Sequence, residues 1–423
     1  MNRDEEAGWP EAPGAGPLGD GRWATETLHP RTVDEVCEVV RGQAEAGRAI
    51  YPQGGRTALH YGRPPGRPGA AIDVTGLNQV IDYPHADMTI TIQAGATVAA
   101  LRSILGEHRQ RLLIDVPQAD RATLGGVYAT NASGPRRFGL GRPRDQIIGV
   151  SFVTSEGVAV KGGGRVVKNV AGYDFPKLLT GSMGTLGVIT QLTLKVRPLP
   201  EASALVWLRV PDVGRIDALL AAFDTSATRP VAIELLNPAA SRIIGGAAGA
   251  AADSWVLAVG LEDGVDSVNW QIDRLGTDFG GLDFEVFRDA GSESLWSALI
   301  EFQAGEPGPI GCVANLRPSR VAAFVGDLDP ERWAVQAHAG NGVVRMQAIG
   351  ECTEDQAARE IDARRAAAVR DGGNLIVARC PTAWKDRLRV WGEPRADWAL
   401  ARRVKQALDP RGLMNPGRFV GDI

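Results

Sequence analysis

Cysteine is scarce in this chain, with four copies among 423 residues. No two cysteines stand close together, so the sequence contains no spacing typical of a zinc site or an iron–sulfur cluster. Isolated cysteines are typical of buried structural thiols, and unpaired thiols suit a reducing compartment. The four positions are Cys37, Cys312, Cys352 and Cys380.

Long apolar runs and an excess of basic charge are also absent. No stretch is apolar for long enough to cross a bilayer, so we expect any membrane association to run through a partner. Residues 1–27 are acidic, rich in proline and glycine, and lack the apolar core of a signal peptide. We therefore expect a disordered lead-in and a cytoplasmic protein. The 46 basic and 50 acidic side chains give no electrostatic basis for binding nucleic acid.

Two common nucleotide-binding motifs are missing. No GxGxxG opens a helix within a βαβ unit and no GxxxxGK[ST] loop occurs, which excludes a Rossmann unit and a P-loop. Glycine itself is abundant, with 52 copies. Because glycine lets backbone approach a ligand closely, its clustering in three segments of the first half is informative.

The first segment, PQGGRT (52–57), directly follows a predicted strand at 49–51. Gly54 and Gly55 would free a row of backbone N–H groups for a pyrophosphate, and Thr57 would add a hydroxyl. A glycine turn without any ligand is the alternative interpretation.

The second and third segments are longer. Residues 118–149 combine small side chains, which suit a flat ring system, with a group of four arginines between 136 and 144 that would balance phosphate charge. A plain surface loop is the alternative, although loops this long usually carry function. Residues 162–190 are again rich in small side chains around Asp174 and Lys168, and Lys168 faces either the ligand or solvent. The four arginines are Arg136, Arg137, Arg142 and Arg144.

Composition and periodicity divide the chain into four parts. A capping box of Thr32 and Glu35 predicts the first helix. From 204 to 379 strands alternate with helices, which indicates helices packed on one face of a sheet. A last helix, predicted over 395–408, ends at DPRGLMNPGRF. The predicted parts are a lead-in (1–27), a ligand-binding domain (28–200), a second α+β domain (201–385) and a C-terminal helix and tail (386–423).

The order of these segments resembles the FAD-binding domain shared by vanillyl-alcohol oxidase, the D-lactate dehydrogenases and the flavin subunits of glycolate oxidase. The resemblance covers residues 30–200 and returns in the terminal DPRGLMNPGRF. GGRVVKNVAGYDFPKLLTGSMGTLGVIT is most similar to the smaller, E-type flavin subunit of glycolate oxidase. The resemblance implies an α+β fold with a PCMH-type FAD-binding domain of two α+β subdomains. A ferredoxin-like α+β cap domain follows, and the C-terminal tail returns to the FAD domain.

The resemblance also implies which residues contact FAD. Some relatives attach the flavin to a histidine directly after the paired glycines. Arg56 occupies that place here, so non-covalent FAD is implied, and we interpret His60 as structural. The implied cofactor residues are Pro52, Gly54, Gly55, Arg56, Thr57, Thr123, Leu124, Gly125, Gly126, Ala129, Asn131, Ser133, Gly134, Gly184, Thr185, Gly187, Val188 and Ile189.

A catalytic site is harder to assign. The similar D-2-hydroxyacid dehydrogenases carry HxGDGNxH and a later EHG, whose two histidines and glutamate resemble metal ligands. In HAGNGVVR, His338 is kept, but Asn341 replaces the aspartate and Arg345 the second histidine. Arg379-Cys380-Pro381 stands where EHG is expected. One imidazole without an acidic partner holds a divalent ion poorly, so we expect no metal.

His338 then has three possible roles: a relic, a core histidine, or a base with Arg345 as a carboxylate clamp. We favour a relic or structural role, and the catalytic residues stay unknown, with His338, Arg345 and Lys168 as weak candidates. Four side chains are candidates to meet at the mouth of the second domain: Arg317, Arg345, Arg379 and Trp384.

Three functions follow from the resemblance. The first is an FAD subunit of a glycolate (or D-lactate) oxidase complex, which passes electrons between a larger flavin subunit and an iron–sulfur subunit. The second is a self-sufficient FAD-dependent 2-hydroxyacid dehydrogenase with a divergent site and a small 2-hydroxy acid as substrate. The third is a structural subunit that holds FAD without turnover.

Overall fold

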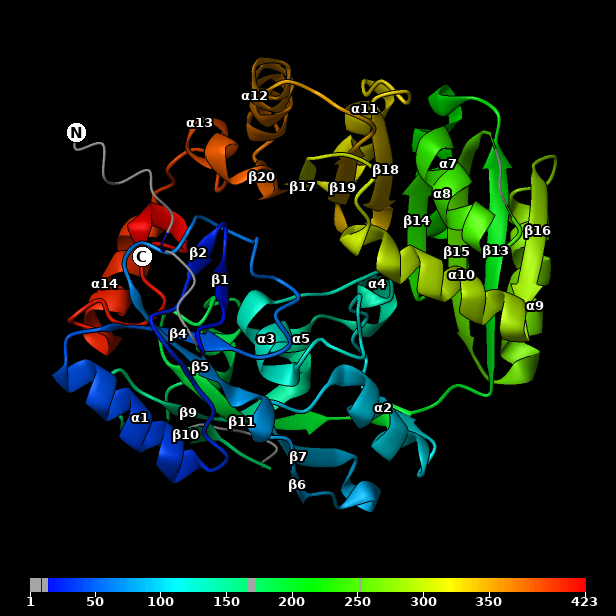
Figure 1. Cartoon of the computed structure of the whole chain (residues 1–423). Helices are drawn as coiled ribbons and strands as arrows, with labels where there is room; N and C mark the ends of the chain where they lie inside the picture. Colours follow the sequence, from blue (N-terminus) through cyan, green and yellow to red (C-terminus); the bar gives the residue numbers. More distant parts are fainter. Residues whose placement is uncertain (1–8, 10–13, 166–171, 251–252) are drawn as a thin grey trace. The chain divides into compact units, whose positions relative to one another are not determined.

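The computed structural model describes residues 9, 14–165, 172–250 and 253–423. The chain divides into two compact units (Figure 1). Unit 1 comprises Met1–Ala132, Arg142–Pro198 and Glu393–Ile423, and unit 2 comprises Ser133–Gly141 and Leu199–Gly392. The sequence prediction had left 133–141 inside the ligand-binding domain, whereas this short stretch packs with unit 2.

A parallel three-stranded sheet begins unit 1, in the order β3-β5-β4. Thr32 caps the helix beside it, as predicted, because its hydroxyl accepts a hydrogen bond from the Glu35 N–H. The apolar face of that helix covers the sheet and forms one core with Leu413 and Met414. The elements are β3 (Thr27–Leu28), α1 (Val33–Glu45), β4 (Ala49–Gln53) and β5 (Gly69–Asp73).

An antiparallel five-stranded sheet forms the rest of unit 1, in the order β10-β9-β11-β7-β6. Two helices, α2 and α3, pack on it and build a second core. The strands are β6 (Val80–Asp82), β7 (Thr89–Gln93), β9 (Ile147–Val153), β10 (Ala159–Gly163) and β11 (Val188–Lys195). The helices of this region are α2 (Val98–Gly106), α3 (Leu124–Thr130), α5 (Pro143–Gln146), α6 (Phe175–Leu179) and the C-terminal α14 (Asp397–Leu408); β8 (Gln110–Arg111) pairs with β12 (Arg197–Pro198).

The structure corrects two predictions in this unit. Residues 17–23, expected to be disordered, form the hairpin β1 (Pro17–Gly19) and β2 (Arg22–Trp23). A buried ion pair of Asp20 with Arg418, at 3.0 Å, ties this hairpin to the C-terminal tail. The segment 118–149, for which a plain surface loop was the alternative, contains α3, which Thr123 caps, and α4 (Arg137–Leu140), which belongs to unit 2. Paired glycines inside α3 weaken its helical signal in the sequence.

Unit 2 is built on an eight-stranded sheet in the order β16-β13-β15-β14-β18-β19-β17-β20 (Figure 1). The strands β13 to β16 lie in the order of a ferredoxin-like β-α-β-β-α-β motif. The strands β17 to β20 form a second motif of this kind, whose order runs in the opposite direction across the sheet. The two motifs are joined where β14 pairs with β18. The strands are β13 (Ala202–Val210), β14 (Ala232–Leu236), β15 (Trp255–Asp263), β16 (Asp283–Arg288), β17 (Gly311–Asn315), β18 (Trp333–His338), β19 (Val343–Ala348) and β20 (Asn374–Arg379).

Helices cover both faces of the β13–β15 part of this sheet, whereas the sequence predicted one face. Alternate residues of β13 point to opposite sides, so Val206 packs with α7 and α9 while Trp207 packs with α8 and α10. The helices of unit 2 are α4, α7 (Ile216–Thr225), α8 (Pro238–Ala247), α9 (Val265–Asp278), α10 (Asp289–Glu301), α11 (Val321–Gly326), α12 (Glu354–Arg370) and α13 (Lys385–Leu388).

Two features that are missing or scarce in the sequence, long apolar runs and cysteines, can be examined in the structure. Within the described ranges, none of the helices combines the length and the apolar character needed to cross a bilayer. Among the described residues, none of the four cysteines forms a disulfide; Cys312 and Cys380 are buried, and Cys37 and Cys352 are partly exposed. Burial raises the pKa of the Cys312 thiol to about 12.

Candidate functional site

The loop 52–57 leaves the end of β4 and presents its backbone to a possible ligand. No described residue accepts a hydrogen bond from the backbone N–H groups of Gly54, Gly55, Arg56 or Thr57. Four consecutive donors without a protein partner form the kind of nest that binds phosphate. The Arg56 side chain does not enter this row, because its guanidinium pairs with Asp73 at 3.1 Å.

The paired glycines of this loop allow it to pack against the second predicted segment. A Cβ at Gly54 would lie 2.0 Å from the Thr123 hydroxyl, and one at Gly55 would lie 1.6 Å from the Arg121 carbonyl oxygen. Both positions therefore require glycine for protein packing. A substitution at Gly55 would disturb folding before it reported on a phosphate.

The third predicted segment joins the other two. The Met183 N–H donates to the Ala129 carbonyl at 2.8 Å, and the Gly181 N–H donates to the Tyr128 carbonyl at 2.9 Å. Gly184 has a φ of 69°, a conformation that favours glycine, and its Cβ position lies 3.7 Å from Pro52 Cγ. All three glycine-bearing segments thus meet inside unit 1.

A hollow of about 570 Å³ opens beside this meeting point. Gly55 and Thr123 border it, together with the turn after β5 and the start of α2. The further lining residues are Thr75, Asn78, Gly95, Ala96, Thr97, Ala100, Asp120 and Arg121.

Some of the implied cofactor residues do not contribute a side chain to the place where the three segments meet. Leu124, Val188 and Ile189 are buried in the apolar cores of unit 1, so they offer a ligand only backbone. Ser133 and Gly134 belong to unit 2. Lys168 lies outside the described residues. The half-exposed or exposed members are Pro52, Gly54, Gly55, Arg56, Thr57, Gly126, Ala129 and Asn131, and the buried ones include Thr123, Gly125, Gly184, Thr185 and Gly187.

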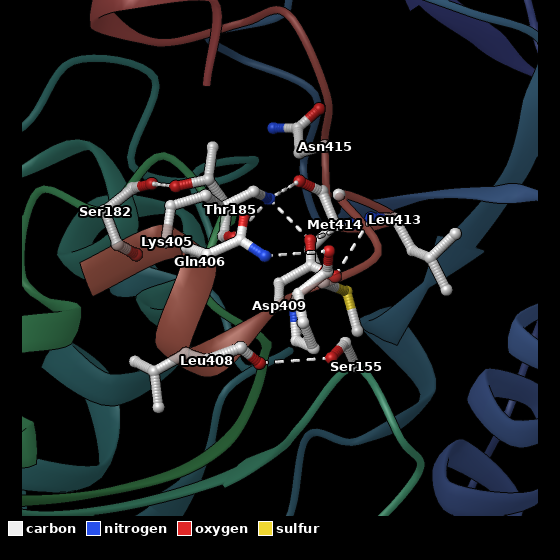
Figure 2. Close-up of polar contacts among 12 residues, drawn as sticks. Ser155, Ser182, Thr185, Lys405, Gln406, Leu408, Asp409, Leu413, Met414 and Asn415 are labelled. Carbon is white, nitrogen blue, oxygen red and sulfur yellow. Dashed lines mark hydrogen bonds and ion pairs between the residues drawn. The ribbon is translucent and has the colours of Figure 1, made fainter. Parts of the chain in front are cut away.

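A buried polar cluster at the C-terminal tail also touches these segments, and the sequence analysis missed its role. The Lys405 ammonium donates to Asp409 at 2.6 Å, to the Met414 carbonyl at 2.7 Å and to the Thr185 carbonyl at 2.8 Å (Figure 2). Burial lowers the pKa of Lys405, and the nearby Asp409 carboxylate partly offsets that effect. The signal was available in the sequence, since Lys405 and Asp409 stand four apart across the end of a predicted helix.

Unit 2 contains a second polar cluster. It lies on the same face of the eight-stranded sheet as α8 and α10. Both His338 and Glu234 are almost fully buried, and the His338 Nδ1 lies 2.8 Å from the Glu234 carboxylate. The Gln336 amide donates to the same carboxylate at 2.7 Å. On the other side of the ring, the Arg345 Nε–H donates to His338 Nε2 at 3.3 Å. The imidazole is therefore held between an acid and a cation.

Glu234 overturns one premise of the sequence analysis, namely that His338 has no acidic partner. The pairing joins residues 104 positions apart, across the β14–β18 ladder. A charged residue inside the apolar run VAIELLN was the signal that could have found it. Among the described residues, however, no group of three His, Cys, Asp or Glu side chains is arranged to hold a metal ion.

The stretch 133–141 packs on this cluster. The Arg345 Nη2 donates to the Ser133 carbonyl at 2.9 Å, and the Phe138 ring occupies the place of a Cβ at Gly340. Arg136 forms a 2.7 Å ion pair with the buried Glu262. These contacts explain why the stretch belongs to unit 2.

The structure brings together only part of the group of side chains expected to meet at the mouth of the second domain. The group comprised Arg317, Arg345, Arg379 and Trp384. Arg345 and Arg379 lie on strands that flank β17, and the Arg379 guanidinium donates to Gln347 at 2.9 Å. Arg317 follows the opposite end of β17, and Trp384 packs against the apolar core. At ~3.3 Å per residue, the two ends of the five-residue strand β17 lie ~13 Å apart.

Comparison with known proteins finds two matching family models in the chain. Residues 25–163 match the FAD binding domain, and residues 391–419 match the C-terminal domain of FAD linked oxidases. In these two segments the chain is similar to FAD linked oxidases. The second match falls on the tail that holds Lys405, Asp409 and Met414.

Several relatives of this chain have names that refer to 2-hydroxy acids. It is 33% identical to D-2-hydroxyglutarate dehydrogenase of Xanthomonas citri over 48% of this chain and 43% of that protein. It is 26% identical to mitochondrial D-lactate dehydrogenase (cytochrome) of Arabidopsis thaliana over 93% and 73%. It is 36% identical to glycolate oxidase subunit GlcE of Escherichia coli over 36% and 43%. The chain thus spans under half the length of two of these relatives.

Solved structures confirm the predicted fold class. p-Cresol methylhydroxylase with bound substrate superposes with a TM-score of 0.68, at 16% identity, over 93% of this chain and 88% of that one. 4-Ethylphenol oxidase from Gulosibacter chungangensis superposes with a TM-score of 0.67, at 14% identity, over 93% and 88%. The chain therefore has the α+β PCMH-type FAD-binding domain and the α+β cap domain that the sequence predicted.

The residues of unit 1 fit FAD. The row of N–H donors at 54–57 suits the pyrophosphate. Two buried hydroxyl groups of the adjoining segments, Tyr128 OH and Ser182 Oγ, have no hydrogen-bond partner among the described residues. Buried polar atoms without a partner are rare, and a ligand rich in donors and acceptors would satisfy such groups.

Proposed function

We propose that this protein is an FAD-dependent oxidoreductase of small 2-hydroxy acids, and that it works as a flavin subunit of a glycolate (or D-lactate) oxidase complex. The observation that carries the chemical part is the arrangement of Glu234, His338 and Arg345 in unit 2. Oxidation of a 2-hydroxy acid requires a base for the hydroxyl proton and a cation for the carboxylate, and this cluster offers one of each.

The hydrogen bonds define a role for each side chain. Because Glu234 accepts at Nδ1 and Arg345 donates at Nε2, the neutral imidazole carries its proton on Nδ1 and a lone pair on Nε2. A substrate carboxylate would compete for the half-buried Arg345 guanidinium and leave Nε2 to accept the hydroxyl proton. Glu234 would then stabilise the imidazolium. FAD, when bound, supplies the two-electron acceptor.

The subunit role rests on similarity. The match to subunit GlcE and the motif in residues 163–190 both support a flavin subunit of a glycolate oxidase-type complex. A larger flavin subunit and an iron–sulfur subunit would be its partners, because four scattered cysteines cannot hold a cluster. The implied cofactor residues of unit 1 would hold the FAD without a covalent bond.

Anaerobic reduction of the isolated protein tests the proposal. We expect the visible absorption of bound FAD to bleach when glycolate or D-lactate is added, and His338→Gln to abolish the bleaching while keeping the FAD. Bleaching that is equally fast in His338→Gln would contradict the role of the cluster. Protein that never acquires visible flavin absorption would contradict the proposal as a whole.

A self-sufficient dehydrogenase is the second candidate, and the same cluster favours it. It predicts complete turnover with an artificial electron acceptor and no partner subunits. The third candidate, a structural flavin-holding subunit, predicts that neither substrate nor reduced partners change the flavin spectrum.

A further inference from the structure

Lys405 occupies the last turn of α14, and its side chain is one-tenth exposed. An ammonium group has three hydrogen-bond donors, and here each donor has an acceptor between 2.6 and 2.8 Å. Two of these acceptors are backbone carbonyls from separate parts of unit 1, at Thr185 and Met414. The charge therefore joins segments that are far apart in the sequence.

Asp409 completes the cluster on the side of the tail. Its carboxylate is fully buried and accepts from the Leu413 N–H at 2.9 Å and from the Met414 N–H at 2.7 Å. These bonds fold DPRGLM into a tight turn (Figure 2). The turn brings residues 413–415 back toward the sheet.

Residues 413–415 run parallel to β4. The Ile50 N–H donates to the Leu413 carbonyl and the Asn415 N–H donates to the Ile50 carbonyl, both at 2.8 Å. β4 leads directly into the loop 52–57, so the tail supports the strand from which that loop departs.

The same tail also holds the third glycine segment. The Asn415 side-chain amide donates to the Met183 carbonyl at 2.5 Å, and Lys405 donates to the Thr185 carbonyl. A Cβ at Gly184, between these two points, would lie 3.6 Å from Asn415 Nδ2 and 3.7 Å from Pro52 Cγ. One cluster is thus bonded to both sides of the predicted FAD site.

We propose that Lys405 is a positioning residue for FAD: through Thr185 and Met414 it sets the spacing between the loops 52–57 and 181–187. This proposal rests on FAD binding by unit 1, and it does not depend on the substrate. A purely structural role would not require a charge, because a buried ion pair is often replaced by apolar residues without loss of stability. The backbone carbonyls of Thr185, in the loop 181–187, and of Met414, in the tail beside β4, explain why an ammonium is used.

The test is the dissociation constant of FAD from the full-length apoprotein, measured by quenching of flavin fluorescence. We expect Lys405→Met to raise it at least tenfold while the apoprotein remains folded by circular dichroism. Lys405→Arg should recover part of the affinity. Lys195→Met, which removes an exposed lysine at the end of β11, is the matched control and should leave the affinity unchanged.

A second variant covers the case in which Lys405→Met does not fold. Asn415→Gly removes only the bond to Met183 and keeps the left-handed backbone of residue 415, whose φ is 42°. We expect it to raise the FAD dissociation constant at least threefold. If Lys405→Met folds, an FAD affinity within twofold of wild type would overturn the positioning role. If Lys405→Met does not fold, the same result in Asn415→Gly would overturn it. A wild-type protein that binds no FAD would instead overturn the proposed function.

Discussion

The Glu234 carboxylate and the His338 Nδ1 lie 2.8 Å apart, with at most one-hundredth of either side chain exposed. A buried carboxylate is costly unless it is hydrogen-bonded, and Glu234 accepts from both His338 and Gln336. The pair therefore fixes the tautomer and the orientation of the imidazole.

Glu234→Gln should separate two roles of this side chain, namely orienting the His338 imidazole and stabilising its charge. The amide keeps the shape of the side chain, but it no longer stabilises an imidazolium. We expect unchanged FAD content, a loss of about 1–3 kcal/mol in the free energy of unfolding, and at least tenfold slower flavin reduction by substrate, about 1.4 kcal/mol in the barrier. Stopped-flow absorbance measures the rate, and Glu285→Gln on β16 is an exposed control. An unchanged rate would leave the pair a structural role only.

Gly126→Leu tests the cofactor site without disturbing the packing. Gly126 is exposed in α3, and among the described residues only the Thr123 hydroxyl lies within 4 Å of its Cβ position. Leucine is a better helix former than glycine, so the apoprotein should gain up to about 1 kcal/mol in stability. We expect FAD affinity to fall at least tenfold by fluorescence titration.

Gly42→Leu, near the C-terminal end of α1, is the control for that experiment. Among the described residues, nothing lies within 4 Å of a Cβ at Gly42. It should give the same helix stabilisation and a normal FAD affinity. Equal FAD affinity in both variants would remove Gly126 from the cofactor site.

Acid precipitation should release the flavin. Arg56 occupies the place of the histidine that carries flavin in some relatives, and its guanidinium is paired with Asp73. We therefore expect the yellow colour in the supernatant after treatment with trichloroacetic acid. Colour that stays with the denatured pellet would show a covalent bond elsewhere in the chain.

The buried thiol of Cys312 should make the protein less stable at high pH. Its pKa is raised by burial from 9.0 to about 12, so above pH 9 the unfolded chain releases this proton while the folded protein keeps it. The stabilisation present below pH 9 is then lost progressively up to about pH 12, by on the order of 1 kcal/mol per pH unit.

Cys312→Ala should remove this component, and urea unfolding between pH 8 and pH 11 measures the change in slope. Tyr51, whose pKa burial also raises to about 12, leaves a residual slope of the same sign. Cys37→Ala is the comparison, since that thiol is only partly buried. A slope identical to that of wild type would contradict the assignment.

Local patterns determined many elements of this protein. The Thr32 cap predicts the start of α1, and the last helix, predicted over 395–408, is α14 over Asp397–Leu408. Caps and periodicity act over a few residues, so neighbouring side chains contain the whole signal. For the same reason, the three glycine segments could be singled out as one cofactor site before their meeting was visible.

The tertiary structure alone decided the pairings between distant residues. Glu234 meets His338 because β14 and β18 are neighbours, and Lys405 meets Thr185 because the tail returns beside β4. It also decided that Ser133 and Gly134 belong to unit 2. Which strands become neighbours depends on how whole faces are buried, and the spacing of residues along one segment does not contain that information.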